Sequence, residues 1–422
     1  MTIPLTFLPR PAVPRLFSRP STGRLALAAC LSLQAACSDA ATSSSADGPD
    51  LTPPAKASAA EAQDKDDVFS VQSIETFDQP WAMTFASEDT LIVTTQPGRM
   101  FRLKWPQTLA NAGTSIGEPE MVEIENVPEV VFEGQGGLGD VMAAPDFSQS
   151  GKLYLSWVEA GDKGLSGAVV ATARLVQEEG KRPRLADIHR IWEQTPKVSG
   201  AGHFSHKLLL SQDGHLFISS GDRQKLDPAQ DMQKNLGKLI RLKPDGSVPD
   251  DNPFTDQGEL AKQFWSIGHR NILGIAQDAD GTIWTNEMGP KGGDELNRIQ
   301  RGDNYGWPVV SNGEHYSGKD IPDHPSRPEF NAPELWWTPV ISPASMVIYG
   351  GDKFPDWQNQ AIIPGLSSEA LIRVSLDDKA AELGRIAMES RMREVEEGPD
   401  GALWVLEDRS NAGLLRLLPR QQ

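Results

Sequence analysis

The amino-acid sequence predicts an all-β fold, a six-bladed β-propeller with four-stranded antiparallel blades, on three observations. A short hairpin-bearing unit recurs six times along the chain. The 38 Gly and 32 Pro residues supply many turns, and the 11 Trp residues favour strands. No long segment has the 3.6-residue apolar period of an amphipathic helix. In a propeller, each such unit is one blade that buries its faces against its neighbours.

Each unit contains turn residues, a short apolar strand and a second strand of the pattern x-L-x-R-L. An Asp-Gly pair before alternating residues is a hairpin signal. In chain order, the expected first strands are 87–93, 151–155, 213–218, 280–284, 359–363 and 400–405. Their expected partners are 98–103, 171–175, 237–242, 294–299, 370–374 and 413–417. The units begin roughly 40 to 80 residues apart, a spacing that suits propeller blades.

The length of 422 residues would by default suggest two or three domains. Because the repeat continues along the chain, we instead expect a single propeller domain over residues 68–420. A pair of β-sandwiches with similar hairpins is the alternative. It does not explain why the spacing of the units persists.

The N-terminal residues 1–37 are predicted to form an export signal. A basic stretch precedes the apolar run 25–33, which ends in small residues before Cys37. The run is too short to span a bilayer as a retained helix. A small-residue ending before a cysteine also resembles a lipoprotein signal, in which Cys37 is acylated. We expect export to the periplasm, either as a protein without a lipid or as one anchored to the membrane by a lipid on Cys37. The alternative is a mis-assigned start or an unstructured extension.

Residues 38–67 are rich in Ser, Ala, Asp and Pro and contain almost no large apolar side chain. Such a segment cannot bury enough surface to offset the entropy lost on ordering. We therefore expect a disordered tether between the signal and the propeller.

The charge and cysteine content exclude several classes of function. With 58 acidic and 40 basic residues, the net charge is −18, which excludes electrostatic attraction to nucleic acid or anionic lipid as the organising principle. The two cysteines, Cys30 and Cys37, both lie near the N-terminus. No disulfide framework or cysteine-based metal site can therefore exist in the propeller.

Two polar clusters suggest proton-transfer and charge-stabilising chemistry. His203 precedes Asp222 in the chain, and a carboxylate that orients a histidine suits general-base catalysis. The alternatives are a metal bound by His203 and His206, or a polar loop packed by glycine. Arg270 follows Gly268-His269, and its fixed donors suit a carboxylate or a developing oxyanion. A structural arginine that caps the loop is the alternative.

Two further clusters suggest ligands of opposite charge. The glycine-rich segment 286–295 carries Glu287 and Asp294, whose oxygens together with free carbonyls are ligands that Ca²⁺ takes. It lacks the spacing of an EF-hand loop. Arg391 and Arg393 alternate in an extended segment, so both guanidinium groups lie on one face. Either an anionic ligand compensates this pair or both arginines are solvated.

Taken in order, nine motifs resemble those of the soluble pyrroloquinoline-quinone-dependent sugar dehydrogenases, the glucose/sorbosone dehydrogenase family. The resemblance covers roughly residues 79–419. The motifs are PWAM (80–83), EGQGGL (133–138), GHF (202–204), SGD (220–222), GHRN (268–271), GPKGGDE (289–295), NYGWP (304–308), RMR (391–393) and GPDG (398–401). The resemblance implies a quinone held in the central cleft of a six-bladed propeller, with Ca²⁺ bridging it.

By motif, the resemblance implies three catalytic residues. His203 would be the general base that takes the proton of the substrate hydroxyl while hydride passes to the quinone. Asp222 would hold and polarise that histidine, and Arg270 would stabilise negative charge on the quinone oxygen.

The resemblance also implies a cofactor site and a metal site. Asn271 would help Arg270 hold the cofactor, while Gln135, Arg391 and Arg393 would contact the quinone and its carboxylates. The implied metal ligands are the carbonyls of Gly289 and Pro290, with Asp294, Tyr305 and Glu287 nearby. A tricarboxylate bound by a net-acidic protein requires arginines concentrated at one place.

The chain departs from the family pattern at three places. Ser205-His206-Lys207 follows His203-Phe204 where the family usually has Gly, a small residue and Arg. Ser367 stands where a cofactor-binding lysine is often found, and Met288 replaces a common histidine.

The leading interpretation is an exported quinone- and calcium-dependent dehydrogenase that acts on an aldose, or on a related polyol or hemiacetal. A non-catalytic propeller that binds a sugar or another partner is the second, and a calcium-dependent propeller lactonase the third. His203, Asp222 and Arg270 together favour the first over the second, while Arg391 and Arg393 favour a polyanionic cofactor over a neutral lactone. The expected partner is a small sugar; the sequence does not identify the electron acceptor.

Overall fold

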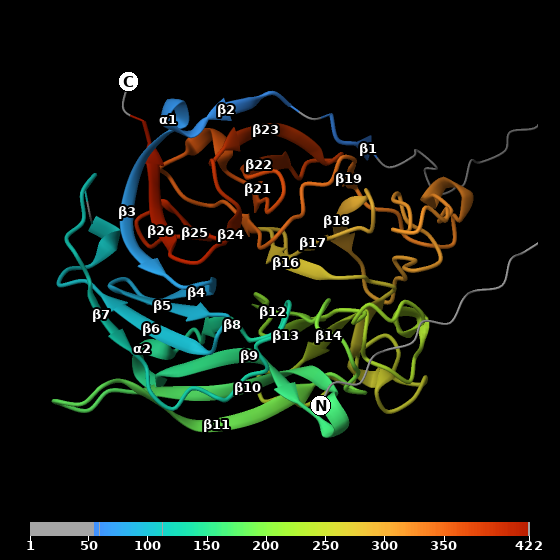
Figure 1. Cartoon of the computed structure of the whole chain (residues 1–422), viewed down its shortest axis with the longest axis horizontal. Coiled ribbons are helices and arrows are strands. Elements are labelled where there is room, and N and C mark those ends of the chain that lie inside the picture. Colours follow the sequence, from blue (N-terminus) through green and yellow to red (C-terminus); the bar gives the residue numbers. More distant parts are fainter. Residues whose placement is uncertain (1–54, 59, 112, 421–422) are drawn as a thin grey trace, which may run out of the picture. The chain divides into compact units, whose positions relative to one another are not determined.

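The computed structural model describes residues 55–58, 60–111 and 113–420, and in them six β-sheets surround a common axis (Figure 1). Blade 1 contains β4 (Pro80–Ser87), β5 (Thr90–Thr95), β6 (Arg99–Lys104) and β7 (Glu120–Glu123). Blade 2 contains β8 (Leu138–Ala143), β9 (Lys152–Ala160), β10 (Ser166–Val176) and β11 (Arg184–Glu193). Blade 3 contains β12 (Ser205–Leu210), β13 (Leu216–Ser220), β14 (Lys238–Leu242) and β15 (Phe264–Ile267).

The remaining three blades follow in chain order. Blade 4 contains β16 (Ile272–Gln277), β17 (Ile283–Glu287), β18 (Asp294–Ile299) and β19 (Leu335–Trp337). Blade 5 contains β20 (Val347–Ile348), β21 (Gln360–Pro364), β22 (Ala370–Ser375) and β23 (Ala381–Ala387). Blade 6 contains β24 (Met392–Glu397), β25 (Leu403–Glu407), β26 (Ala412–Pro419) and β3 (Phe69–Phe77). The predicted six-bladed propeller with four-stranded antiparallel blades is confirmed.

Helices among the described residues are short connections. The α-helices are α1 (Lys65–Val68) and α2 (Phe147–Ser150). The 3-10 helices are Leu109–Asn111, Asp162–Gly164, Asp227–Gln230, Ala261–Gln263, His324–Ser326 and Pro355–Trp357. None of these helices is long and apolar enough to cross a membrane.

The two strands expected in each unit are the second and third strands of each blade. In blade 1, β5 pairs antiparallel with β6, and in blade 6 β25 pairs with β26 in the same way. The apolar side chains that marked the units are buried because they pack between adjacent sheets. Six of them identify the repeat: Leu91, Leu153, Leu216, Ile283, Ile362 and Leu403. The x-L-x-R-L strands supply the opposing leucines.

Blade 6 closes the ring by joining both ends of the domain. Strand β3 precedes blade 1 in the chain but pairs antiparallel with β26, from Phe69 opposite Pro419 to Phe77 opposite Ala412. A buried ion pair supports this blade, since Arg416 Nε lies 2.8 Å from Asp400 Oδ2. Because removing either partner would leave a buried charge, the pair fixes where β26 lies.

The second half of the predicted tether differs from the expectation. Strand β1 (Ala55–Lys56) pairs parallel with β19, and β2 (Ala62–Asp64) pairs parallel with β23, so blades 4 and 5 gain a fifth strand. Both strands are exposed, so backbone hydrogen bonds to open sheet edges hold them rather than apolar burial. The export signal predicted for residues 1–37 lies outside the described residues.

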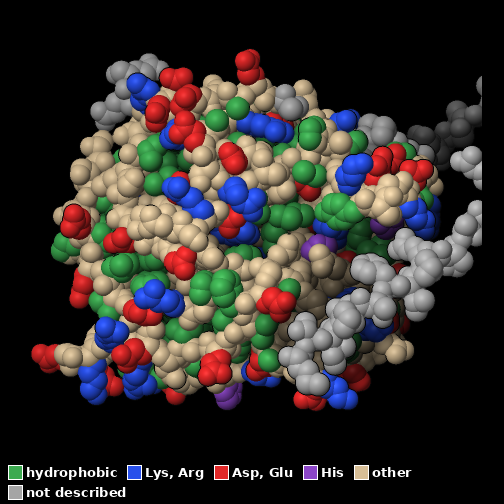
Figure 2. Space-filling view, in the orientation of Figure 1, with side chains coloured by type: hydrophobic (Ala, Val, Ile, Leu, Met, Phe, Trp, Pro, Cys, Tyr) green, Lys and Arg blue, Asp and Glu red, His purple; other side chains and the backbone are tan. Residues whose placement is uncertain are grey.

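The first strand of each blade lines the axis, where it contacts the first strand of the next blade. Across this channel, Lys207 Nζ on β12 lies 3.0 Å from Asp140 Oδ1 on β8 and 2.9 Å from Glu394 Oε2 on β24. The ion pairs therefore link blades 2, 3 and 6 beneath the candidate site. On the face shown in Figure 2, acidic and basic side chains are interspersed.

Candidate functional site

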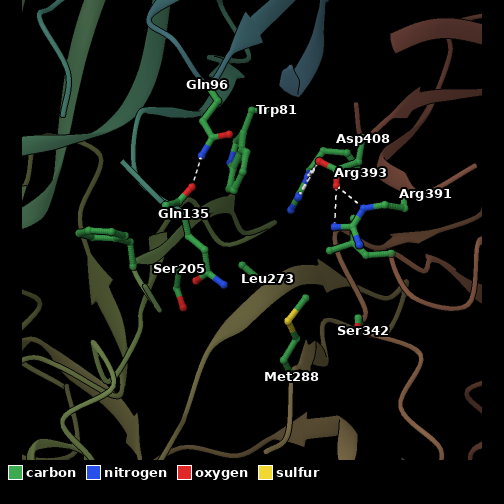
Figure 3. Close-up of a pocket in the computed structure, with 13 residues that line it drawn as sticks. Trp81, Gln96, Gln135, Ser205, Leu273, Met288, Ser342, Arg391, Arg393 and Asp408 are labelled. Carbon is green, nitrogen blue, oxygen red and sulfur yellow. Dashed lines mark hydrogen bonds and ion pairs between the residues drawn. The ribbon is translucent and has the colours of Figure 1, made fainter. Parts of the chain in front are cut away.

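Two adjoining cavities open where the connections between strands converge at one end of the axis. The smaller has a volume of about 420 Å³ and the larger about 630 Å³. Gln135, Met288 and Ser342 line both, so the two cavities form one cleft with two compartments. Figure 3 shows residues that line the smaller compartment. The smaller is also lined by Trp81 and an arginine pair, and the larger by His203 and Arg270. This cleft is the candidate site.

The structure brings His203 and Asp222 together as predicted, since His203 Nδ1 lies 2.7 Å from Asp222 Oδ1. The backbone of His203 has a positive φ of 50°, which is uncommon for a residue with a side chain. Its amide donates to Gln135 Oε1 at 2.7 Å, and this contact ties the histidine to the loop that carries Gln135. Because Nδ1 faces the carboxylate, Nε2 remains for a ligand.

Asp222 is fully buried and accepts four hydrogen bonds. Oδ1 accepts from His203 and from the amide of Gln224 at 2.8 Å. Oδ2 accepts from the indole Nε1 of Trp307 at 2.8 Å and from the amide of Leu226 at 3.3 Å. Burial alone would raise the pKa of Asp222, but the hydrogen bonds from His203 and Trp307 lower it below its ordinary value. Asp222 is therefore a carboxylate when it faces His203.

Burial lowers the pKa of His203 below 6.5, and it outweighs the hydrogen bond to Asp222, which acts in the opposite direction. The positive charge of Arg270 lowers this pKa further. His203 is consequently neutral near pH 7 and can accept a proton at Nε2.

Arg270 and Asn271 leave donors free next to the cleft. Arg270 Nη1 donates to the carbonyl of Met288 at 2.7 Å, and its guanidinium carbon lies 5.3 Å from the centre of the Trp307 ring. Asn271 Oδ1 accepts from the hydroxyl of Ser205, which lines the smaller cavity, at 3.1 Å. Among the described residues, buried Arg270 Nε and Asn271 Nδ2 have no hydrogen-bond partner. Such donors suit a polar ligand, because buried polar atoms are normally paired.

Arg391 and Arg393 lie side by side with an aspartate between them (Figure 3). Arg391 Nη2 and Arg393 Nη2 each lie 2.7 Å from an oxygen of Asp408, and Arg393 lies 4.2 Å from the ring centre of Trp81. Burial alone would raise the pKa of Asp408, but the two arginines lower it. One carboxylate balances one of the two cations, so the group retains a positive charge for an anionic ligand.

Sequence reasoning missed Asp408, although the strand pairing contains a signal for it. In the antiparallel hairpin of β24 and β25, Met392 faces Glu407, so Asp408 follows directly opposite Arg391. It also assigned no role to Trp307, which was part of a motif but contacts both Asp222 and Arg270. That contact joins segments 85 residues apart, and no local pattern indicates it.

The residues implied as metal ligands lie in one region but their side chains do not converge. Glu287 accepts from the amides of Arg270 and Asn271 and from His269 Nδ1. Asp294 accepts from the amides of Gly289, Ile341 and Ser342. The hydroxyl of Tyr305 donates to the carbonyl of Arg298 at 2.6 Å. No group of three or more His, Cys, Asp or Glu side chains that could hold a metal occurs in the described part of the chain.

The carbonyls of Gly289 and Pro290 remain as candidate ligands on the cleft wall. Neither accepts a hydrogen bond from another described residue. A Cβ at position 289 would lie 2.2 Å from the carbonyl oxygen of Gly293, so the loop requires glycine there. Burial raises the pKa of Asp294 to about 6, and its three backbone donors hold the loop against the Ile341–Ser342 segment.

The departures from the family pattern have different consequences. Lys207 forms ion pairs with Asp140 and Glu394 beneath the cleft. Its ammonium group therefore links strands of the channel and does not bind a ligand. Ser367 has an exposed hydroxyl that reaches the carbonyl of Val340 at 3.4 Å. Met288 lines both cavities, so it lies where the two compartments meet.

The fold is a six-bladed propeller, and its axial cleft contains a buried histidine–aspartate pair and an arginine pair. These features place the protein in the class of propeller enzymes. The family model described as "Glucose / Sorbosone dehydrogenase" matches residues 77–416. The chain belongs to this glucose/sorbosone dehydrogenase family, a family of oxidoreductases that act on CH–OH groups.

Three relatives illustrate the similarity. The chain is 39% identical to the aldose sugar dehydrogenase YliI of Escherichia coli over 351 residues, which cover 81% of this chain and 91% of the relative. It is 25% identical to quinoprotein glucose dehydrogenase B of Acinetobacter calcoaceticus over 367 residues, covering 67% of this chain and 75% of that one. A crystal structure of the soluble aldose sugar dehydrogenase of Escherichia coli in the apo form matches with a TM-score of 0.73 and 36% identity, covering 83% of this chain and 100% of that chain.

Proposed function

We propose that this protein is a dehydrogenase that oxidises an aldose with pyrroloquinoline quinone and Ca²⁺ bound in the axial cleft. The buried His203–Asp222 pair beside a cationic, partly unpaired set of donors carries the proposal. The names of the relatives support it, since one is a quinoprotein glucose dehydrogenase and another an aldose sugar dehydrogenase. A neutral histidine fixed by a buried carboxylate favours turnover over simple binding.

The donors in and next to the cleft fit a planar tricarboxylate. Arg391 and Arg393 would hold its carboxylates, while Asn271 Nδ2 and Arg270 Nε offer hydrogen bonds that no described residue takes. The carbonyls of Gly289 and Pro290 would hold Ca²⁺, a cation that prefers oxygen ligands. When bound, the quinone supplies the two-electron acceptor for the hydrogen of the sugar CH–OH group.

Residues of the chain provide proton transfer, charge stabilisation and substrate binding. His203 Nε2 takes the proton of the sugar hydroxyl, and Asp222 stabilises the imidazolium that forms. Arg270 places a positive charge next to the reacting region, where negative charge develops on oxygen. The larger cavity, with room for a sugar and a mixture of polar side chains and carbonyls, would bind the substrate beside His203.

The pH dependence should report the state of His203. The base must be neutral, so kcat/KM should be lost as the pH falls through the pKa of His203, which lies below 6.5. Because Arg270 lowers this pKa, Arg270→Gln should raise it and move the acidic limb of the kcat/KM profile to higher pH. An acidic limb that stays in place in this variant would contradict the assignment of His203 as the base.

Reconstitution tests the proposed function. Purified protein is incubated with pyrroloquinoline quinone and Ca²⁺, and reduction of an artificial electron acceptor is followed with a panel of aldoses. We expect turnover that requires both additions and that a chelator of Ca²⁺ removes. The absence of both a bound-quinone spectrum and turnover would refute the proposal.

Export to the periplasm and acylation of Cys37 remain predictions about residues 1–37. They are checked by expressing the full chain and a Cys37→Ala variant, then measuring the mass of the mature N-terminus and its partition into membranes. A mature protein that retains residues 1–37 would contradict the predicted signal.

A further inference from the structure

The indole of Trp307 occupies an unusual place among the described aromatic side chains. It belongs to the connection between β18 and β19, is 5% exposed, and packs with Ala229 and Ile321. Its indole N–H donates a hydrogen bond to Asp222 Oδ2 at 2.8 Å. It is the one described side chain other than His203 that donates to this buried carboxylate.

The four donors to Asp222 act in two pairs. The amides of Gln224 and Leu226 come from the loop that follows Asp222 itself, so they move with it. Trp307 approaches from another blade and contacts the oxygen opposite the one that faces His203. A carboxylate held at both oxygens cannot rotate freely, so the Trp307 contact, together with the weaker one from the amide of Leu226, fixes which oxygen accepts from His203.

Trp307 is itself held in place by its backbone. Its amide donates to the carbonyl of Gly268 at 2.9 Å, and its carbonyl accepts from Gln230 Nε2 at 2.7 Å. Gln230 and Asn304 exchange two hydrogen bonds, at 2.7 and 3.0 Å. The indole is therefore anchored independently of Asp222.

The same ring also touches the cation of the site. The guanidinium carbon of Arg270 lies 5.3 Å from the ring centre of Trp307, a distance at which a cation is attracted to an aromatic face. Among the described residues, the guanidinium makes one hydrogen bond, from Nη1 to the carbonyl of Met288. One indole thus connects the carboxylate behind the base with the arginine beside it.

We propose that Trp307 is a positioning residue whose indole N–H holds Asp222, and through it His203, in the orientation that leaves His203 Nε2 free for the substrate. This role rests on the proposed function, in which His203 is the base. The ring of Trp307 fixes Arg270 at the same time, so base and cation keep a constant relative position.

Two variants separate the N–H group from the ring. Trp307→Phe removes the donor and part of the ring, whereas 3-benzothienylalanine at position 307 keeps the shape and replaces N–H by sulfur. Trp284→Phe is the matched control, because Trp284 is also buried and donates to a carboxylate, Asp278 Oδ2 at 2.9 Å, away from the cleft.

The first measurement needs no cofactor. The His203 Nδ1–H proton is identified by NMR as the resonance that His203→Ala removes, and its exchange with water is measured. Losing a hydrogen bond to a charged group costs about 1.5–3 kcal/mol. We therefore expect both position-307 variants to exchange this proton at least about tenfold faster, and Trp284→Phe to exchange it at the wild-type rate.

The second measurement is steady-state turnover of the reconstituted enzyme with glucose. Both position-307 variants should lose about tenfold or more in kcat, with KM little changed. If the benzothienyl variant keeps the wild-type exchange rate and kcat, Trp307 only packs and the inference is wrong. If the wild type oxidises no aldose, the proposed function fails, and the exchange rates alone then decide whether Trp307 orients the pair.

Discussion

Replacing His203 with alanine is expected to abolish aldose turnover while cofactor binding stays close to wild type. His203 contacts Asp222 and the Gln135 side chain, and neither contact supplies charge to the arginine-lined cavity. Loss of a positioned general base lowers rates by about 10²- to 10⁴-fold. Steady-state kcat with glucose and equilibrium titration with pyrroloquinoline quinone measure the two quantities separately.

The matched control for this variant is His215→Ala. His215 also pairs with an aspartate, with Nδ1 at 2.9 Å from Asp213 Oδ2, but it lies in the turn before β13 and lines neither cavity. Its variant should retain turnover. Equal losses of cofactor binding and turnover in His203→Ala would show that His203 holds the cofactor and is not the base.

Replacing Arg393 with glutamine is expected to weaken cofactor binding about 10- to 150-fold, the equivalent of about 1.5–3 kcal/mol for a hydrogen bond to a charged group. The Arg393 side chain is 11% exposed and contacts both Asp408 and Trp81, so its charge acts in a partly desolvated place. Without Arg393, the negative charge of Asp408 would cancel the positive charge of Arg391. The cavity would then lose its excess positive charge.

Arg409→Gln is the control for the arginine variant. Arg409 lies in the same turn as Asp408 and pairs with Glu407, yet it does not line the smaller cavity. Isothermal titration of both variants with the quinone and Ca²⁺ distinguishes a local contact from a general charge effect. Equal weakening in the two variants would refute a direct contact between Arg393 and the cofactor.

The blades were predictable because each one repeats a local pattern. Leu91 and Leu403 occupy the same position in their units, and a period of two in short strands leaves few other arrangements. Strands β1 and β2 were not predictable, because exposed residues that pair through backbone atoms carry no apolar signal. The closure of blade 6 by β3 was not predictable either, because it depends on which sheet edge is left unpaired in the fold.

The candidate site was only partly predictable, for a related reason. Motifs placed His203, Asp222 and Arg270 near the cleft, and the structure brings them together. The roles of Asp408 and Trp307 were not predictable, because their contacts form only when hairpins and remote connections fold together.

For Glu287, Asp294 and Tyr305, the sequence pattern identified possible metal ligands but gave no information about the protein groups that contact their oxygens. Acidic residues in a glycine-rich loop suggested a metal, but protein donors occupy both carboxylates and the hydroxyl of Tyr305 donates to a carbonyl. The sequence shows which residues are acidic, and only the fold shows which donors reach them.

Anaerobic single turnover tests the central claim most directly. Cofactor-free protein is loaded with pyrroloquinoline quinone and Ca²⁺, one equivalent of glucose is added without any acceptor, and the absorbance of the bound quinone is recorded. We predict that the oxidised spectrum gives way to the reduced one in the wild type and persists in His203→Ala. A bound quinone whose spectrum glucose and other aldoses leave unchanged in the wild type would contradict the account.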